Sequence, residues 1–318
     1  MYFGDYFDNP KITEIEKSLS KDNFKTKMEE AYRLHFDSEP HPDVFTGYKF
    51  FNKEPFTNVQ LMEQGLHVFR MIFARHAGKI REEGYDWFDD GIGVMHFEDY
   101  CDNEFVNKIR KEIDLLPISE NKQPFNTVQA LEAQDYPSIV QLVKESDIFD
   151  RCCKSVRRST ESIDAQEYYL NTTFVQRVDN SPTDGDIQKV CHSDIFFPAV
   201  KFWYFPYDVN EDDGPFMYGE HSPTLTHRII DFHYRESVNV VKGTWDREKR
   251  NKGHGEGSFR ALPADLEDMG VELKAQPVKA NSLVIANVSG FHCRGNTKFR
   301  SVRSSVHGAI RLEDCFAT

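Results

Sequence analysis

The sequence predicts an α+β fold in which helices pack against a β-sandwich or jelly roll. Helical periodicity dominates up to about residue 156, and from Tyr168 onward strand-like segments alternate with clusters of Gly, Pro, Asn and Asp. Aromatic residues make up 13% of the 318 residues, a content that suits a β-rich core or an apolar pocket. Helices that come first and strands that follow favour a single α+β domain.

The first helices are expected near the start of the chain. Apolar residues recur at helical spacing over residues 12–32, with one polar break. Thr57 can cap a further helix whose apolar face spans residues 61–73. We therefore expect residues 1–88 to form a helical extension that packs on the core.

A strand and a capped helix are expected after this extension. The sequence GIGVMHF (91–97) is a short strand candidate. Asp102 can then cap a helix whose apolar residues lie within 105–113 and which stops before Pro117. Another helical stretch is expected over about residues 139–156.

The second part of the chain is expected to be rich in strands. The strand candidates are residues 168–178, 200–205, 238–241, 282–287 and 302–310. A long segment from about His227 to Asp268 is polar, carries both charge signs and lacks hydrophobic periodicity. Long irregular insertions often serve as lids, so we expect a lid at about 227–268, with a plain surface loop as the alternative.

Charge and composition exclude several classes of function. A formal net charge of −13 argues against binding to nucleic acid or to anionic membranes. No apolar run approaches the ~20 residues of a membrane span, and no secretory signal is visible. The six cysteines form no CxxC pair and no regular framework, so neither a zinc site nor a disulfide scaffold is indicated. A reduced, cytoplasmic setting is the expectation.

The chemistry of the chain is indicated by a His-x-Asp motif. His192 and Asp194 lie on one face if this segment is a strand, because side chains alternate with a period of two. His292 follows about one hundred residues later and can complete a set of two imidazoles and one carboxylate. That set leaves three octahedral positions open, as Fe(II) oxygenases require. With 12 histidines in the chain, the motif alone is a weak signal.

A second polar group follows on the strand after His292. Arg303 and Ser305 are two residues apart and should face the same way, together with His307, whereas Val306 should face the other way. A guanidinium can bind a carboxylate bidentately, and a hydroxyl adds a hydrogen bond. This pair is therefore suited to bind the distal carboxylate of a dicarboxylate cosubstrate.

These motifs carry a resemblance to a known family. The segments HSDIFFPAVKFWYFPYDVNEDDGPFMYGEHSPTLT and LVIANVSGFHCRGNTKFRSVRSSV resemble the phytanoyl-CoA dioxygenase-like family of Fe(II)/2-oxoglutarate oxygenases. With the opening GIGVMHFEDYCDNEFVNKIRKEIDLLP, the similarity spans about residues 90–312. It implies a double-stranded β-helix core over residues 89–318, and 2-oxoglutarate and O2 as cosubstrates. It also implies that Fe(II) is held by His192, Asp194 and His292.

The resemblance assigns further residues. An Arg about eleven positions after the distal His corresponds to Arg303, with Arg300 as its competitor, and the Arg-x-Ser pair favours Arg303. Additional contacts to 2-oxoglutarate are expected from Thr173 and Gln188. Trp203 stands where the family often has a pocket aromatic that contacts substrate, and core packing explains this residue equally well.

Two details refine the expected activity. Gly-Glu-His-Ser at 219–222 replaces the family's usual Gly-Ser-His, which makes His221 a loop-shaping residue and not a ligand. Asp194 distinguishes the chain from halogenating relatives, which lack this carboxylate. The resemblance therefore implies hydroxylation, desaturation or oxidative ring closure, with release of succinate and CO2.

The expected substrate is a small polar, amino-acid-like metabolite of a biosynthetic route. The reason is a set of cations in the expected lid that could hold carboxylates, although a solvated loop explains them as well. These cations are Arg228, Arg235, Lys242, Arg247, Lys249, Arg250 and Lys252. The alternatives are a protein side-chain hydroxylase with an open groove and a non-catalytic metal-binding jelly roll. The pair of Arg303 and Ser305 argues against the latter.

Overall fold

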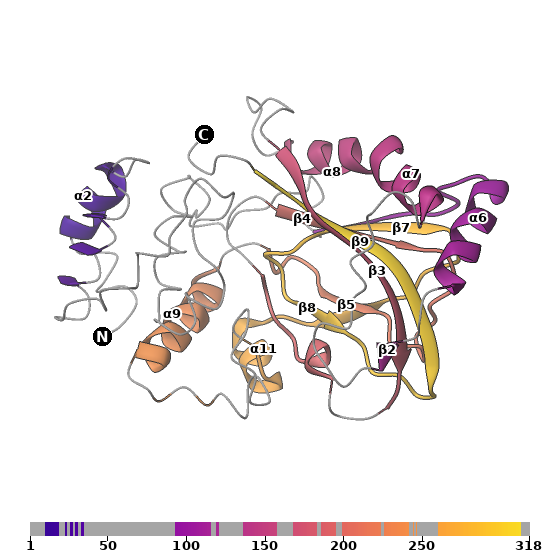
Figure 1. Ribbon diagram of the computed structural model, residues 1–318. Coiled ribbons are helices and arrows are strands. Elements are labelled where there is room, and N and C mark those ends of the chain that lie inside the picture. Colours follow the sequence, from indigo (N-terminus) through magenta and orange to yellow (C-terminus); the bar gives the residue numbers. More distant parts are fainter. Residues whose placement is uncertain are drawn as a thin grey trace.

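The computed structural model describes most of the second part of the chain and pieces of the first. The described residues are 10–18, parts of 23–34, 93–115, 119–120, 136–157, 168–182, 186–194, 199–223, 226–241, 244, 246 and 260–312. Within them the chain forms two β-sheets and several helices (Figure 1). The predicted α+β fold is confirmed.

The larger sheet has six strands. In spatial order they are β1 (Val94–Phe97), β7 (Ser282–Asn287), β4 (Ala199–Phe205), β9 (Ser301–Leu312), β3 (Tyr168–Asn180) and β2 (Ser119–Glu120). All neighbours are antiparallel except β2 and β3. Although β9 is the last strand along the chain, it lies in the middle of the sheet and pairs with both β3 and β4.

The smaller sheet faces one side of the larger sheet. Its order is β6 (Leu273–Gln276), β5 (Phe216–Gly219) and β8 (His292–Arg294), all antiparallel. Side chains of both sheets share one apolar core, with Trp203 packed against it. The core residues are Val94, Phe205, Val209, Phe216, Tyr218, Val278, Val284 and Ala286. We call the surface of the larger sheet that meets this core its inner face.

Three helices cover the opposite face of the larger sheet (Figure 1). They are α6 (Asn103–Asp114), α7 (Pro137–Glu145) and α8 (Ile148–Arg157). Alternation along β4 directs Val200, Phe202 and Tyr204 into the core beneath these helices, where α6 contributes Ile109. The predicted cap of α6 is confirmed, because the Asp102 carboxylate accepts a hydrogen bond from the Phe105 N–H at 2.9 Å.

The segment 227–268 differs from the expectation. It was expected to be irregular, with a strand at 238–241, but residues His227–Val241 form the helix α9 and Pro263–Met269 form α11. Among the α9 side chains that the structure describes, the buried ones recur at helical spacing and are Ile229, Phe232, His233 and Glu236. Because two of these four are polar, a pattern of apolar residues alone misses the helix. Most residues between α9 and α11 lie outside the described part.

The remaining expectations have mixed outcomes. The helix α2 (Pro10–Ser18) confirms the first helical pattern, whereas the helix expected after Thr57 lies outside the described residues. The stretch expected over 139–156 is two helices, α7 and α8, with Ser146 extended between them. The strands β5, β6 and β8 were missed. None of the helices in the described residues is both long and apolar enough to cross a membrane.

Candidate metal centre

The two histidines of the predicted site are held together by their backbones. His192 follows the short 3-10 helix η2 (Ile187–Lys189), and His292 opens β8. Each donates its backbone N–H to the carbonyl of the other, at 3.0 and 2.8 Å. Their rings therefore lie on one side of the pair, with centroids 4.6 Å apart. Asp194 is fixed next to them by its own N–H, which donates to the Val288 carbonyl at 2.8 Å.

The three side chains converge on one point. One ligand atom from each of His192, Asp194 and His292 lies within 4.8 Å of the others. Asp194 Oδ1 is 3.5 Å from His192 Nε2, and Asp194 Oδ2 is 3.9 Å from His292 Nε2. Two ring nitrogens and one carboxylate oxygen at this spacing fit a metal ion with several coordination positions left open. In the described part of the chain no other group of His, Cys, Asp or Glu has this spacing.

The protonation states of the three groups suit a metal. Burial holds the pKa of His192 well below its usual value, and the charge of Arg260 is the second cause of this shift. Burial also lowers the pKa of His292. Burial opposes ionisation of Asp194, but the Lys201 ammonium and the two imidazoles outweigh it, so its pKa lies well below the usual range. Neutral imidazoles and an ionised carboxylate are the forms that bind divalent metals.

The second nitrogen of each ring has a defined partner. His292 Nδ1 is 2.8 Å from the Gly290 carbonyl, so Nδ1–H donates there and Nε2 keeps its lone pair. His192 Nδ1 is 3.2 Å from the Val190 carbonyl and 2.5 Å from Arg260 Nη1. Because a guanidinium can only donate, this contact must give way before His192 can bind a metal through Nε2.

Arg303 is a partly buried cation with a buried Nε, and it has no anionic partner among the residues that the structure describes. Burial, followed by the nearby Arg294, lowers its pKa to about 9. Its guanidinium carbon lies 5.3 Å from the ring centroid of Phe205. None of the residues that the structure describes forms an ion pair with it or accepts a hydrogen bond from its buried Nε. Arg294, in contrast, is paired with Asp186 at 2.8 Å. A buried charge of this kind fits an incoming carboxylate.

The expected alternation along β9 is confirmed. Val306 and Ile310 lie in the core beneath the helices, so Arg303, Ser305 and His307 belong to the inner face. Ser305 is buried. Burial, with the Lys201 and Arg303 charges, lowers the pKa of His307 to about 3. The inner face of β9 therefore carries the Arg-x-Ser pair toward the core between the sheets.

Arg300 has a different environment from Arg303. It is exposed, and its Nε donates to both carboxylate oxygens of Asp179 at 2.9 and 2.8 Å. The same guanidinium holds the pKa of Asp179 below its usual value. Arg300 therefore already has a carboxylate partner, whereas Arg303 has none among the described residues.

The two weaker cosubstrate candidates, Thr173 and Gln188, lie on β3 and η2. Thr173 is paired with Gly308 across β3 and β9, and its side chain lies outside the described residues. Gln188 lies in η2, where its N–H donates to the Asp186 carboxylate at 2.9 Å. Across the pairing of β3 with β9, Gln176 lies directly opposite Ser305, and the two side chains share one face of the sheet. Alternation along this strand could have identified Gln176 from the sequence.

Trp203 lies in the core between the sheets. Its ring centroid is 4.7 Å from that of Phe216, which in turn is 5.7 Å from that of His292. Phe216 thus stands between Trp203 and the metal ligands. Packing accounts for Trp203 in this arrangement, and its contact with substrate stays a prediction.

Two charged residues of the site were missed from the sequence. Lys201 lies on the inner face of β4, and its ammonium is ion-paired with Asp194 Oδ2. A lysine two residues before Trp203 in an otherwise apolar strand was an available signal. Arg260 is buried beside His192 and gave no signal, because it follows a polar segment without periodicity.

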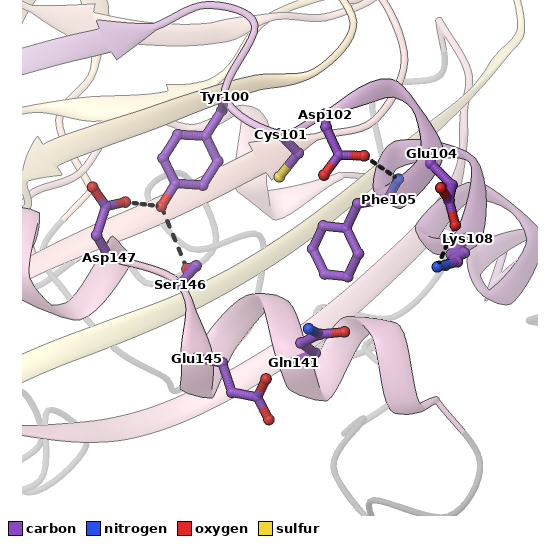
Figure 2. Close-up of a pocket in the computed structure, with 10 residues that line it drawn as sticks. All are labelled: Tyr100, Cys101, Asp102, Glu104, Phe105, Lys108, Gln141, Glu145, Ser146 and Asp147. Atoms are coloured by element: carbon purple, nitrogen blue, oxygen red, sulfur yellow. Dashed lines mark hydrogen bonds and ion pairs between the residues drawn. The ribbon is translucent and has the colours of Figure 1, made fainter.

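A cavity of about 570 Å³ lies elsewhere, between the start of α6 and the turn from α7 to α8 (Figure 2). There the Tyr100 hydroxyl is hydrogen-bonded to Asp147 and, at 3.4 Å, to Ser146 Oγ. The lining residues are Tyr100, Cys101, Asp102, Glu104, Phe105, Lys108, Gln141, Glu145, Ser146 and Asp147. None of the predicted site residues lines this cavity, which lies on the helix-covered side of the larger sheet.

Comparison with known proteins gives distant structural likenesses. No protein-family model matches the chain. No curated protein matches it either. HygX from Streptomyces hygroscopicus, solved with iron bound, is 15% identical over 70% of this chain and 83% of its own, with a TM-score of 0.43. EctD from S. alaskensis, solved with 2-oxoglutarate and 5-hydroxyectoine, is 13% identical over 75% and 76% of the two chains, with a TM-score of 0.43.

A third structure is that of the epimerase SnoN in complex with Fe3+, alpha ketoglutarate and nogalamycin RO. It is 14% identical over 76% of this chain and 84% of its own, with a TM-score of 0.44. Because these scores lie below 0.5, the three likenesses carry no argument about this chain.

Proposed function

We propose that the protein is an Fe(II)- and 2-oxoglutarate-dependent oxygenase that acts on a small polar, amino-acid-like metabolite in biosynthesis. In this proposal His192, Asp194 and His292 hold the iron, and Arg303 with Ser305 binds the distal carboxylate of 2-oxoglutarate. The substrate loses a C–H hydrogen and is hydroxylated, desaturated or closed into a ring, while succinate and CO2 are released.

The observation that carries the proposal is Arg303, a cation on the inner face of β9 that has no anionic partner among the described residues. A metal-binding protein without catalysis has no need of a second, anion-seeking group at this place. A buried guanidinium is costly unless a carboxylate joins it, and a dicarboxylate chelating a nearby metal supplies one. Ser305, buried beside it on the same strand, offers a hydroxyl to the same carboxylate.

The metal ligands support the proposal independently. His192 and His292 are neutral and Asp194 is ionised, so the set carries one negative charge, which suits a divalent ion. The donor set of two nitrogens and one oxygen is that of non-haem Fe(II) oxygenases. When bound, iron supplies the reaction of O2 with 2-oxoglutarate that yields an oxidant strong enough for a C–H bond.

The residues of the chain would position the reactants. Arg303 fixes the far end of 2-oxoglutarate, which orients its keto acid toward the metal ligands. The apolar core that contains Phe216 and Trp203 keeps water from this side of the ligands. In the wider architecture we assign residues 89–318 to a double-stranded β-helix of the phytanoyl-CoA dioxygenase-like type, residues 1–88 to a helical extension, and about 227–268 to a lid.

The proposal is tested by loading the protein anaerobically with Fe(II) and then 2-oxoglutarate. The expected result is the visible charge-transfer band of an Fe(II) chelate of a 2-oxo acid, followed by succinate and CO2 after O2 is admitted. A protein that binds Fe(II) but gives neither the band nor succinate would be a metal-binding jelly roll, and the proposal would be wrong. Small metabolites and peptides, compared as stimulators of succinate release, separate a metabolite oxygenase from a protein hydroxylase.

A further inference from the structure

A pair of cysteines lies directly beside the proposed metal ligands. Cys191 precedes His192 in the chain, and Cys293 follows His292. Both cysteines are free thiols and both are buried, at 4% and 7% exposure. Neither belongs to the proposed ligand set or to the proposed 2-oxoglutarate anchor.

The backbone sets the two cysteines opposite each other. His192 and His292 exchange both of their backbone N–H···O bonds, so they are a hydrogen-bonded pair of an antiparallel bridge. One step along each segment, Cys191 and Cys293 therefore form the adjoining pair, which is not hydrogen-bonded. The Cα atoms of such a pair lie about 4.5 Å apart, within the roughly 4.4–6.8 Å that a disulfide spans.

The two cysteine side chains share the face of the bridge opposite to the histidine rings. Side chains alternate along extended segments, so those at 191 and 293 point one way and those at 192 and 292 point the other. Burial raises the pKa of Cys191 well above its usual value, and the Cys293 thiol raises it further. The two thiols therefore lie close enough to interact.

Neighbouring segments hold both cysteines in place. The Ala261 N–H donates to the Cys191 carbonyl at 2.8 Å, and Cys293 is paired with Met217 across β8 and β5. Each cysteine segment therefore has a bonded neighbour on its far side in addition to the bridge between the two. The closeness of the thiols is a property of the fold and needs no rearrangement of the chain.

We propose that hydrogen peroxide closes a reversible disulfide between Cys191 and Cys293, and that this bond weakens metal binding by His192 and His292. The bond itself needs only the two thiols and the oxidant. Its effect on the metal rests on the proposed function, to which it adds regulation by an oxidant.

Peroxide alone balances the reaction. The sulfur of one cysteine attacks a peroxide oxygen, the O–O bond breaks, and a sulfenic acid and one water form. The sulfur of the other cysteine attacks the sulfenic sulfur, the S–O bond breaks, and the disulfide and a second water form. The two sulfur atoms lose two electrons to the peroxide oxygens, and both thiol protons end in water. Because both thiols are buried, the reaction should be slow and should exclude bulky oxidants such as glutathione disulfide.

The disulfide would contract the face of the bridge that lies behind the ligands. Cβ atoms of directly opposite residues lie about 4.5–5.5 Å apart, whereas those of a disulfide lie about 3.8 Å apart. Closing this gap on one face tilts the histidine rings on the other face away from each other. Metal sites tolerate displacements of only about 0.2 Å in ligand distance, so the affinity for a divalent ion should fall.

The test maps the bond and measures its effect on the whole chain without metal. After treatment with hydrogen peroxide and removal of the excess by catalase, peptide mapping without reductant should show Cys191 joined to Cys293. Anaerobic titration should then give a Co(II) affinity at least about tenfold weaker than that of the untreated protein. Reduction with a phosphine, followed by desalting, should restore both the free thiols and the affinity.

Matched variants separate this pair from other sites of oxidation. In Cys191→Ser and in Cys293→Ser, peroxide should leave the Co(II) affinity unchanged. Cys101→Ser removes a thiol on the helix-covered side of the larger sheet, and it should respond to peroxide as the wild type does. If a serine variant does not fold, the comparison of oxidised with reduced wild type still decides the question.

The outcomes separate this inference from the proposed function. Failure of the reduced wild type to bind Co(II) would refute the proposed metal site, whereas the peptide map would still decide whether the disulfide forms. Absence of a link between Cys191 and Cys293 after peroxide treatment would refute the modification site. If the link forms but the Co(II) affinity is unchanged, or if reduction does not restore a lowered affinity, the coupling to the metal is refuted.

Discussion

His192 and His292 face each other across a pair of mutual backbone hydrogen bonds, although about one hundred residues separate them in the chain. Their ring positions are set by the backbone and not by side-chain contacts alone. Removal of one ring should therefore leave the pairing of the two segments in place. The metal site can be altered without loss of the fold, which makes its residues suitable for substitution.

The first prediction concerns the metal ligands. His192→Ala, Asp194→Ala and His292→Ala should each abolish 2-oxoglutarate turnover and weaken Fe(II) binding by more than about 100-fold, because even outer-sphere partners of metal ligands are worth ~10- to 100-fold. Calorimetric metal titration and circular dichroism would measure affinity and fold. His96→Ala, which removes an exposed imidazole bonded to Gln276, should bind metal normally. Normal Fe(II) affinity in Asp194→Ala would refute the ligand set.

The second prediction compares two arginines. Arg303→Leu should weaken 2-oxoglutarate binding by roughly 10- to 100-fold, since a charge-assisted hydrogen bond contributes about 1.5–3 kcal/mol. Arg300→Leu should change it little, because Arg300 is exposed and paired with Asp179. Equilibrium binding to the anaerobic metal-loaded protein measures both. The reverse order would transfer the anchor to Arg300.

A third prediction concerns the effect of Arg303 on the stability of the protein. Without cosubstrate, Arg303→Leu should unfold at the same or a higher denaturant concentration than the wild type, because the substitution removes a buried charge that has no partner among the described residues. With 2-oxoglutarate at ~100 times its dissociation constant, the wild type should gain roughly 2.7 kcal/mol and the variant far less. Clear destabilisation of the variant without cosubstrate would mean that Arg303 has a structural partner.

The sequence predicted the convergence of His192, Asp194 and His292, and it predicted that Arg303 and Ser305 share one face of a strand. In a strand, residues two apart share a face whatever the rest of the fold, and this rule placed Arg303 and Ser305 correctly on one side of β9. The same rule applied to β4 would have identified Lys201. Arg260 could not be found, since its position beside His192 follows from a bridge between two segments far apart in the chain.

The missed secondary structure has a physical cause as well. The strands β5, β6 and β8 have three or four residues each, too few to show a period of two. Helix α9 buries His233 and Glu236, so its inner side is not apolar. Its Arg235 is ion-paired at 2.8 Å with Asp265 of α11, so this cation, expected to hold substrate, already joins two helices.

A fourth prediction concerns the buried pair of Asp186 and Arg294. Asp186→Asn should destabilise the protein by roughly 3–5 kcal/mol, because it removes the carboxylate that lies 2.8 Å from the buried Arg294 guanidinium. Urea unfolding measures the change. Asp212→Asn removes an exposed carboxylate 3.6 Å from Lys298 and should cost less than about 1 kcal/mol. The double variant Asp186→Asn/Arg294→Met should recover much of the lost stability. If the loss persists in the double variant, its cause is the lost cap that Asp186 forms at the start of η2, and not the charge of Arg294.

The fifth prediction concerns pH. The folded state keeps His307 neutral down to a pKa of about 3, whereas the unfolded chain takes up the proton near 6.5. Between these values the unfolded state binds more protons, so the free energy of unfolding falls as pH falls, by up to ~1.4 kcal/mol per pH unit. His307→Gln lacks this dependence. Denaturation between about pH 6 and 4 should show a steeper loss for the wild type, and parallel curves would contradict the buried neutral imidazole.

The central place of β9 in the larger sheet has a consequence for synthesis of the protein. Both β3 and β4 lack the hydrogen-bonded neighbour on one of their two edges until residues 301–312 have left the ribosome. A nascent chain that ends before this strand exposes two long strand edges, which favour aggregation. Arg303, the proposed anchor for 2-oxoglutarate, lies on the same strand, so the sheet and this proposed site would be completed together. A truncated product lacking these residues would need chaperone protection to stay in solution.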